Sequence, residues 1–290
     1  MARSQRQPGR NPLSSKDSDS GSDGFISLWR AMSEGMTMKI SIITASYNRE
    51  AFIGDSIRSL YVQTFQDFEH LVVDGASKDK TLEIVKSVSD SRTVAISEPD
   101  KGVCDAFNKG LSRATGDIIG FLHSDDFFAD ENTLQIVADT FADKQCDLVF
   151  GDLDYVSSAD PGRVVRHWRA GVFSKEALEY GWMPPHPTVF ITRNLLERIG
   201  SFDCKYKISC DYDFLLRCLT QDGLKVWYIP KTLVKMRLGG VSNGSVSRIL
   251  AKTLEDYTVI KRHKIGRYGA MPTLFFKNIR KIPQFFNKET

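Results

Sequence analysis

Three polar clusters in this 290-residue sequence carry side chains that could bind a phosphorylated ligand. They are Ser46-Tyr47-Asn48, Asp74-Gly75 and Ser124-Asp125-Asp126, and each directly follows a short apolar run. Carboxylate oxygens suit hard divalent cations, so Asp125 and Asp126 could hold Mg2+ or Mn2+. A cation there could bridge a diphosphate and stabilise the charge that develops as it leaves. The alternative is that the two carboxylates cap a following helix.

A further carboxylate, Asp211, lies at the predicted start of a helix. The apolar face of this helix contains Phe214, Leu215 and Leu219, which would fix the first turn against a core. Asp is favoured as an N-cap, so from the residues alone Asp211 is interpreted as an ordinary cap.

The segments that carry the first three clusters alternate between strand and helix patterns. Buried strands are predicted at 39–45, 68–74, 93–97 and 117–123, with amphipathic helices between them. This alternation predicts an α/β fold with a mainly parallel sheet and helices on both faces. Ligands bind such sheets beyond the carboxyl ends of the strands, so we expect the three clusters to meet along one edge.

The pattern changes after Phe150. A hairpin is predicted around residues 160–162, followed by a proline-rich loop at 183–187 and a short strand over the segment TVFI. A helix is then predicted over 211–219, and a strand over KVWYIP.

The two ends of the chain differ from its middle. Residues 1–37 are rich in Ser, Asp, Gly and Arg and are predicted to be disordered, because they bury too little apolar surface to offset their ordering entropy. Residues 38–245 are predicted to form the folded domain. Residues 246–290 are basic and aromatic, which indicates either a solvated helix packed on the core or a helical extension that contacts anionic membrane. An RNA-binding tail is a third reading, but nothing upstream resembles a nucleic-acid module.

The composition is that of a globular protein, with 41% hydrophobic and 26% charged residues and a net charge of +3. This charge is too small to indicate nucleic acid as a partner. No apolar run approaches the roughly 18 residues of a membrane span, and the polar N-terminus lacks the apolar stretch of a secretory signal. Five cysteines without metal-ligand spacing predict reduced thiols, and a cytoplasmic location is expected.

The three motifs, taken together with their order and spacing, resemble the family 2 glycosyltransferases of GT-A fold, a Rossmann-like α/β architecture. The resemblance rests on the segments 42–48, 72–79 and 120–126 and extends from about Met38 to about Asn243. The proline-rich loop, the start of the Asp211 helix and the segment 236–242 are similar to bacterial members that build surface polysaccharides.

The resemblance implies roles for individual residues. Asp74 would accept a hydrogen bond from the uracil of a nucleotide-sugar donor, and Tyr47 would stack on or cover the base. Asp126 would coordinate the cation, and Asp211 would be the catalytic base of an inverting displacement. The remaining donor contacts implied by the resemblance are Thr44, Ala45, Asn48, Ser124 and Asp125.

Three departures from the family pattern affect the predicted site. Cys210 stands where many members have Glu, and it is read as a small packing residue or a reactive thiol. Phe107 stands where many members have an Arg that neutralises the diphosphate, so Lys101 or Lys109 would supply this charge beside Asn108. The segment 237–240 lacks the His that often completes the metal site, and His186 is a possible substitute.

The sequence therefore predicts an inverting glycosyltransferase that acts at the inner membrane face. Its donor would be a UDP-sugar and its acceptor a glycan or lipid-linked glycan. One alternative is a sugar-1-phosphate nucleotidyltransferase, which would need a Gly-rich basic loop after the first strand instead of Ser46-Tyr47-Asn48. The other is an inactive protein that binds nucleotide sugars, which would release no free UDP from a donor.

Overall fold

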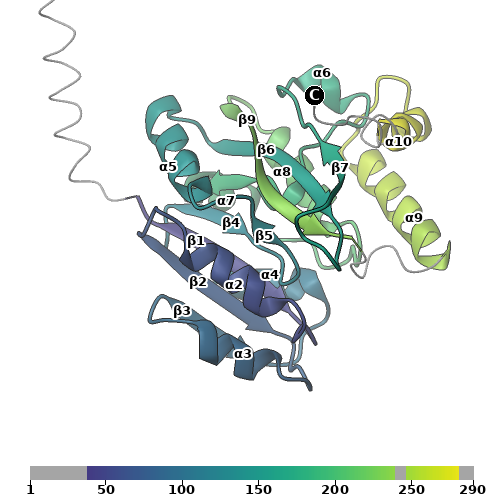
Figure 1. Ribbon diagram of the computed structural model, residues 1–290. Helices are drawn as coiled ribbons and strands as arrows, with labels where there is room; N and C mark the ends of the chain where they lie inside the picture. The colour runs from purple at the N-terminus through teal and green to yellow at the C-terminus, as the bar shows by residue number, and fades with distance from the viewer. Residues whose placement is uncertain (1–37, 239–245, 281–290) are drawn as a thin grey trace, which may run out of the picture. The chain divides into compact units, whose positions relative to one another are not determined.

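The computed structural model describes residues 38–238 and 246–280 (Figure 1). The predicted disorder of residues 1–37 lies outside the described residues. Gly239-Gly240 and residues 281–290 lie outside them as well.

The first part of the sheet is parallel, as predicted. Its strands lie side by side in the order β3-β2-β1-β4, and all three neighbouring pairs run parallel. Their bounds are β1 Ile40–Ser46, β2 Phe68–Asp74, β3 Thr93–Ser97 and β4 Ile118–Phe121. The apolar runs of the sequence thus located the strands to within two residues at each end.

The second part of the sheet is mixed. The strand β8 pairs antiparallel with β4 and with β6, and β6 pairs parallel with β9. The predicted hairpin around residues 160–162 is confirmed, because β6 and β7 pair antiparallel across it. The bounds are β5 Phe127–Phe128, β6 Leu148–Val156, β7 Val164–Trp168, β8 Phe190–Thr192 and β9 Val226–Arg237.

Helices cover both faces of the sheet, which confirms the predicted fold class. Successive strand residues point to opposite faces, so Ile42 and Ile43 of β1 belong to two different apolar clusters. The Ile42 cluster includes residues of α2 and α5, whereas the Ile43 cluster includes residues of α4, α7 and α8. The bounds are α2 Ile53–Tyr61, α3 Thr81–Val88, α4 Val103–Leu111, α5 Thr133–Lys144, α7 Arg193–Ile199 and α8 Cys210–Leu219.

The helix α4 lies unusually close to β1. A β-carbon at Gly110 would lie 2.4 Å from Cγ2 of Ile43, a separation that only glycine permits. The backbone of α4 is therefore packed closely on β1.

Two C-terminal helices, α9 (Val246–Arg262) and α10 (Ala270–Ile279), pack near α8 (Figure 1). The buried ammonium of Lys277 lies 2.8 Å from a carboxylate oxygen of Asp256 and 3.3 Å from the ring centroid of Tyr212. The buried carboxylate of Asp213 lies 2.9 Å from Nε2 of His263. The pair of Lys277 with Asp256 joins α10 to α9, whereas Asp213 and His263 join α8 to the residue that follows α9.

Candidate active site

The three polar clusters lie along one edge of the sheet. Ser46 at the end of β1 is in register with Asp74 at the end of β2, and Ile43 is in register with Phe121 at the end of β4. The Asp125-Asp126 pair lies in the turn that follows β4. Nε of Arg49 lies 3.9 Å from Oδ2 of Asp125. The loop after β1 therefore contacts the carboxylate pair directly.

The loops after β1 and β2 are joined by hydrogen bonds. The backbone N–H of Asn48 donates to Oγ of Ser77 at 2.8 Å, and the N–H of Lys78 donates to Oδ1 of Asn48 at 2.9 Å. Asn48 has a φ of 51°, a left-handed conformation that asparagine tolerates better than most residues. Asn48 thus shapes the rim of the site with its own backbone and side chain.

Asp74 is fully buried, and its carboxylate already accepts three hydrogen bonds. The donors are the backbone N–H and the hydroxyl of Ser77 and the hydroxyl of Ser97, at 2.9, 2.5 and 2.7 Å. Next to it, a β-carbon at Gly75 would lie 2.4 Å from Oδ2 of Asp100 and 3.4 Å from Cδ2 of Tyr47. Tyr47 is 53% exposed, so it is available to cover a ligand at this edge.

The side chains of the last three residues of β1 are directed into the interior of the protein. The hydroxyl of Thr44 is buried and lies 3.0 Å from Nε2 of His70, and Ala45 packs against the core. The hydroxyl of Ser46 is buried without a hydrogen-bond partner among the described residues. Of these three side chains, only Ser46 is left with an unused polar atom.

The predicted donor residues of α4 are placed differently from one another. Asn108 makes two hydrogen bonds with the backbone of Phe202, at 2.9 and 2.8 Å, and so joins α4 to the segment that precedes α8. Nζ of Lys109 donates to the carbonyl of Pro99 at 2.8 Å and lies 3.0 Å from a carboxylate oxygen of Glu98. Lys101 is exposed at the rim.

Asp126 has the chemistry of a cation ligand. It is 1% exposed, its Oδ1 accepts the backbone N–H of Arg237 at 3.3 Å, and its Oδ2 is buried without a partner among the described residues. Burial and the neighbouring charge of Asp125 raise its pKa well above the usual value. A divalent cation would satisfy the unpaired oxygen and favour the ionised form, so this residue fits such an ion.

A complete set of protein ligands is not assembled around Asp126. Within residues 38–238 and 246–280, no three His, Cys, Asp or Glu side chains are grouped to hold one ion. His186 therefore does not complete a three-residue site. A cation at Asp126 would take its other ligands from a bound diphosphate and from water, as Mg2+ commonly does.

Arg237 organises the carboxylate pair, a role that the sequence analysis missed. Its guanidinium donates to the carbonyl of Asp125 at 3.0 Å and to Oδ2 of Asp55 at 2.7 Å, and its side chain is only 5% exposed. The same residue supplies the N–H that reaches Asp126. A long cationic side chain at the end of β9 was the available signal, but its partners lie more than 100 residues away.

Asp211 lies in the first turn of α8, where its Oδ1 accepts the N–H of Tyr212 at 2.7 Å. Burial lowers the pKa of both His123 and His186, and the charge of Asp211 opposes this shift in both rings. Asp125 opposes it at His123 as well. Asp211 and Asp125 are therefore both within electrostatic range of His123.

His123 and His186 form an aromatic layer at this centre with Phe107. The two imidazole centroids are 5.8 Å apart, and Phe107 lies 5.6 Å from His123 and 6.1 Å from His186. Burial lowers the pKa of His186 to about 4, so its ring is neutral at neutral pH. Nε2 of both histidines is buried without a partner among the described residues. Phe107, which replaces the expected Arg, supplies packing here and no charge.

One expectation about the cysteines is wrong. Cys104 and Cys210 form a disulfide, whereas reduced thiols were expected, and Cys210 is neither a packing residue alone nor a free thiol. Among the described residues, Cys146, Cys204 and Cys218 are free. The two bonded residues are 106 positions apart, and only the meeting of α4 with the start of α8 brings them together.

Comparison with known sequences identifies the same family as the motifs. A family model described as "Glycosyl transferase family 2" matches residues 41–206. A glycosyltransferase of Mycobacterium bovis, described as acting in PGL/p-HBAD biosynthesis, is 32% identical over 219 residues. That alignment covers 74% of this chain and 83% of the mycobacterial protein.

Solved structures share the fold. TarS of S. aureus, residues 1–349 in complex with UDP-GlcNAc, superposes with a TM-score of 0.60 at 22% identity, covering 86% of this chain and 72% of that one. The chain covers 39% of a longer TarS chain. The mannosyltransferase PcManGT from Pyrobaculum calidifontis, in complex with GDP-Man and Mn2+, also superposes with a TM-score of 0.60, at 18% identity, covering 90% of this chain and 80% of that one. These likenesses confirm the predicted GT-A fold.

Proposed function

The chain belongs to glycosyl transferase family 2, and from this premise we propose that it transfers a sugar from a UDP-sugar to a hydroxyl of a glycan or lipid-linked glycan, with inversion at the anomeric carbon. One observation carries the proposal. Asp211 and Asp125 both act electrostatically on the buried ring of His123, and Asp126, the neighbour of Asp125 in the chain, has a buried oxygen without a partner among the described residues. A cation ligand and a base are therefore available at one site.

Asp126 is proposed to hold a divalent cation, Mg2+ or Mn2+, with Asp125 and Ser124 beside it. The cation would neutralise the charge that develops on the departing diphosphate. Arg237 holds the pair in place, because its backbone N–H donates to Asp126 and its guanidinium donates to the carbonyl of Asp125. PcManGT was solved with GDP-Man and Mn2+, which supports the use of a divalent ion by this fold.

Asp211 is proposed to act as the general base. It would accept the proton of the acceptor hydroxyl while that oxygen forms its bond to the anomeric carbon and the bond to the diphosphate oxygen breaks. Its place in the first turn of α8 suits this role, because the N–H groups of Lys207, Ile208 and Ser209 all donate to the carboxylate of Glu255 and fix the preceding loop. The carboxylate of Asp211 is thus held by a rigid support.

The donor nucleoside is proposed to lie between Tyr47 and the loop that follows β2. Tyr47 would cover the base. Asp74 would shape the pocket through its hydrogen bonds with Ser77 and Ser97. Thr44, Ala45 and Asn48 would lie below the ribose. Lys101 is exposed and would approach the diphosphate. Asn108 and Lys109 are proposed to support this region through their bonds to Phe202 and Pro99. TarS was solved with UDP-GlcNAc, which supports a UDP-sugar as donor.

The acceptor is proposed to be presented at the cytoplasmic face of a membrane. No helix within the described ranges is long and apolar enough to cross a bilayer. The helix α10 nevertheless exposes Met271, Phe275 and Ile279 along one side, and Lys264 and Arg267 are exposed just before it. Exposed apolar side chains beside cations suit the interface of an anionic membrane. A role in cell-surface polysaccharide synthesis would follow.

The direct test is a panel of UDP- and GDP-sugars, each assayed with and without Mn2+ for stabilisation of the protein and for release of free nucleoside diphosphate. We expect one UDP-sugar to raise the melting temperature and to be turned over in the presence of Mn2+, because ligand affinity appears as stability. Stabilisation without turnover would indicate a binding protein. Pyrophosphate release from UTP and a sugar phosphate would indicate a nucleotidyltransferase.

A further inference from the structure

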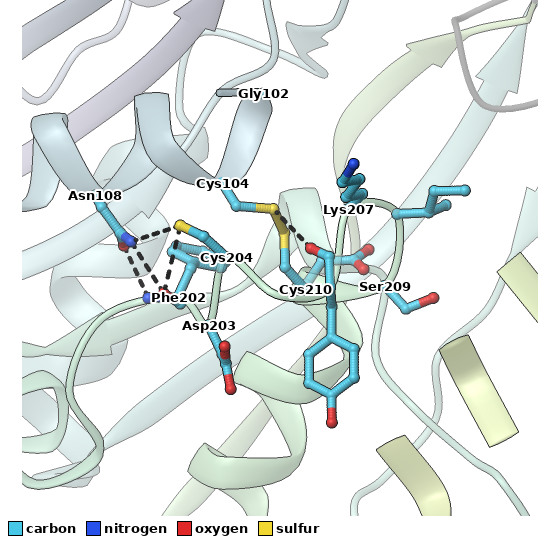
Figure 2. Close-up of a disulfide and its surroundings, with 12 residues drawn as sticks. Gly102, Cys104, Asn108, Phe202, Asp203, Cys204, Lys207, Ser209 and Cys210 are labelled. Carbon is cyan, nitrogen blue, oxygen red and sulfur yellow. Dashed lines mark hydrogen bonds between the residues drawn. A yellow bond between two sulfur atoms is a disulfide. The ribbon is translucent and has the colours of Figure 1, made fainter. Parts of the chain in front are cut away.

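The disulfide between Cys104 and Cys210 joins the two halves of the proposed site. Cys104 is the second residue of α4, and Cys210 is the first residue of α8, directly before Asp211. Figure 2 shows the sulfur bridge between the helix that carries Asn108 and the segment that carries Lys207 and Ser209. The two Cα atoms are 6.5 Å apart, and both residues are nearly fully buried.

On the α4 side the bond is attached to a fixed support. Gly110 places α4 against Ile43 of β1, so the helix cannot move without moving the sheet edge. Asp100, which lies against Gly75 and close to Tyr47, is only four residues from Cys104. The sulfur of Cys104 is therefore held in place near the proposed donor pocket.

On the α8 side the bond meets the first turn of the helix, whose preceding segment is also joined to α4 by the hydrogen bonds of Asn108 to Phe202. Ser209 occupies the N-cap position of α8, but its side chain makes no capping hydrogen bond and donates instead to Asp256 of α9. Glu255 of α9 accepts the three N–H groups before the helix. These contacts tie the turn to α9, whereas the disulfide ties it to α4.

We propose that the Cys104–Cys210 disulfide is a positioning tether, which holds the first turn of α8 and the carboxylate of Asp211 against α4, so that its reduction lowers turnover without weakening donor binding. The inference rests on the proposed role of Asp211 as base. Asp211 is adjacent to Cys210 in the chain, so a displacement of the sulfur is transmitted directly to the carboxylate. A displacement of about 1 Å can cost about 100-fold in rate.

The tether is chemically reversible. A dithiol reductant gives two electrons and two protons, the S–S bond breaks, Cys104 and Cys210 become thiols, and the reductant becomes a disulfide. The bonds of Asn108 to Phe202 involve neither sulfur, so we expect α4 and the segment before α8 to stay associated after reduction while Asp211 gains freedom. In a reducing compartment such a bond would be open to reduction, and disulfides found there are usually catalytic or redox-sensing.

The test compares the wild type, the double variant Cys104→Ala/Cys210→Ala and the control Cys146→Ala, whose free thiol is buried in the other apolar cluster. Each is assayed with and without dithiothreitol for kcat and KM of the UDP-sugar, for UDP affinity, and for amide hydrogen exchange over residues 203–214. We expect reduction of the wild type to lower kcat at least about ten-fold and to speed exchange over 203–214, with UDP affinity unchanged. The double variant should show both effects without reductant and no further response to it, whereas Cys146→Ala should respond like the wild type.

Three results would overturn the tether. They are unchanged exchange over 203–214 after verified reduction, a rise in donor KM at constant kcat, and a double variant that still responds to dithiothreitol. If no UDP-sugar is turned over, that result counts against the proposed function alone. The exchange measurement over 203–214 then still decides whether the disulfide is a tether. An Asp211→Asn variant with full turnover would remove the base assignment. The predicted effect of the tether on kcat would then be withdrawn too, and only the effect of the tether on hydrogen exchange would remain.

Discussion

Replacement of Asp126 by asparagine should make the metal-free protein more stable while removing its response to Mn2+. The carboxylate has one buried oxygen without a partner, and burial together with Asp125 holds its pKa well above the usual value. A neutral amide is cheaper to bury than a charged carboxylate, and it still offers an oxygen to the N–H of Arg237. The change therefore exchanges function for stability.

The size of the gain follows from the removed charge, because Nδ2 of asparagine takes the place of the unpaired oxygen and is equally without a partner. A buried polar group without a partner costs about 1–3 kcal/mol, and more when it is charged, so removal of the charge should return about 1–3 kcal/mol. Since 1 kcal/mol shifts the melting temperature of a domain of this size by about 2–4 °C, Asp126→Asn should melt roughly 2–12 °C higher than the wild type in EDTA at neutral pH.

The gain should depend on pH in a defined direction. Below the ordinary value of 3.8 the carboxyl is protonated in both the folded and the unfolded chain, so the substitution removes no titration effect. As pH rises, the unfolded chain ionises first, because the folded pKa is raised. The difference between variant and wild type should therefore grow from about pH 4 upward and level off above the folded pKa.

The assay is thermal unfolding of the wild type, Asp126→Asn and the surface control Asp143→Asn, in EDTA and in Mn2+ with UDP, at several pH values. The control carboxylate is exposed, so its loss should change stability by no more than about 0.5 kcal/mol. A variant that melts below the wild type in EDTA at neutral pH, or that Mn2+ and UDP stabilise as strongly as the wild type, would refute the reasoning.

Three further predictions concern the support of the site, its pH dependence and its membrane contact. Glu255→Gln should lower the free energy of unfolding by about 1–3 kcal/mol in urea titrations, because three backbone N–H groups lose a charged acceptor, whereas exposed Glu197→Gln should have little effect. His70 is buried with its pKa lowered to about 3, so the wild type should lose stability as pH falls below 6.5, when only the unfolded chain takes up this proton, and His70→Gln should lose less over the same range. An equal slope in both proteins would contradict the assignment. Phe275→Glu should reduce cosedimentation with vesicles that contain anionic lipid, and exposed Val172→Glu should not; equal binding by all three proteins would remove the membrane contact.

Much of the fold could be predicted from the sequence because β1, β2 and β4 are buried on both faces, and such strands are continuous apolar runs. The bounds of β2 agree with the predicted ones at both ends. So do those of the edge strand β3, which is partly exposed but rich in β-branched residues. The strand β5 and the short helix α6 (Lys175–Leu178) were not predicted, because two to four residues carry too little periodicity. β5 exists because β9, more than 100 residues later, pairs with it.

The site could be predicted only where its residues belong to local motifs. Asp125 and Asp126 are adjacent and follow a strand, so their position was evident. Arg237 and the Cys104–Cys210 bond have no local signal, because their partners come from distant parts of the chain. Motifs likewise predict which residues are near a ligand, but not which of them already have partners, as Asn108 and Lys109 do here.

The central claim is that Asp211 is the base of a glycosyl transfer. Its most direct test is the turnover of the UDP-sugar by Asp211→Asn, together with the dissociation constant of UDP in the presence of Mn2+. The account predicts a fall in kcat of about 10²–10⁴-fold, the usual contribution of a general base, with UDP affinity unchanged. Turnover at the wild-type rate by a folded Asp211→Asn enzyme would contradict it.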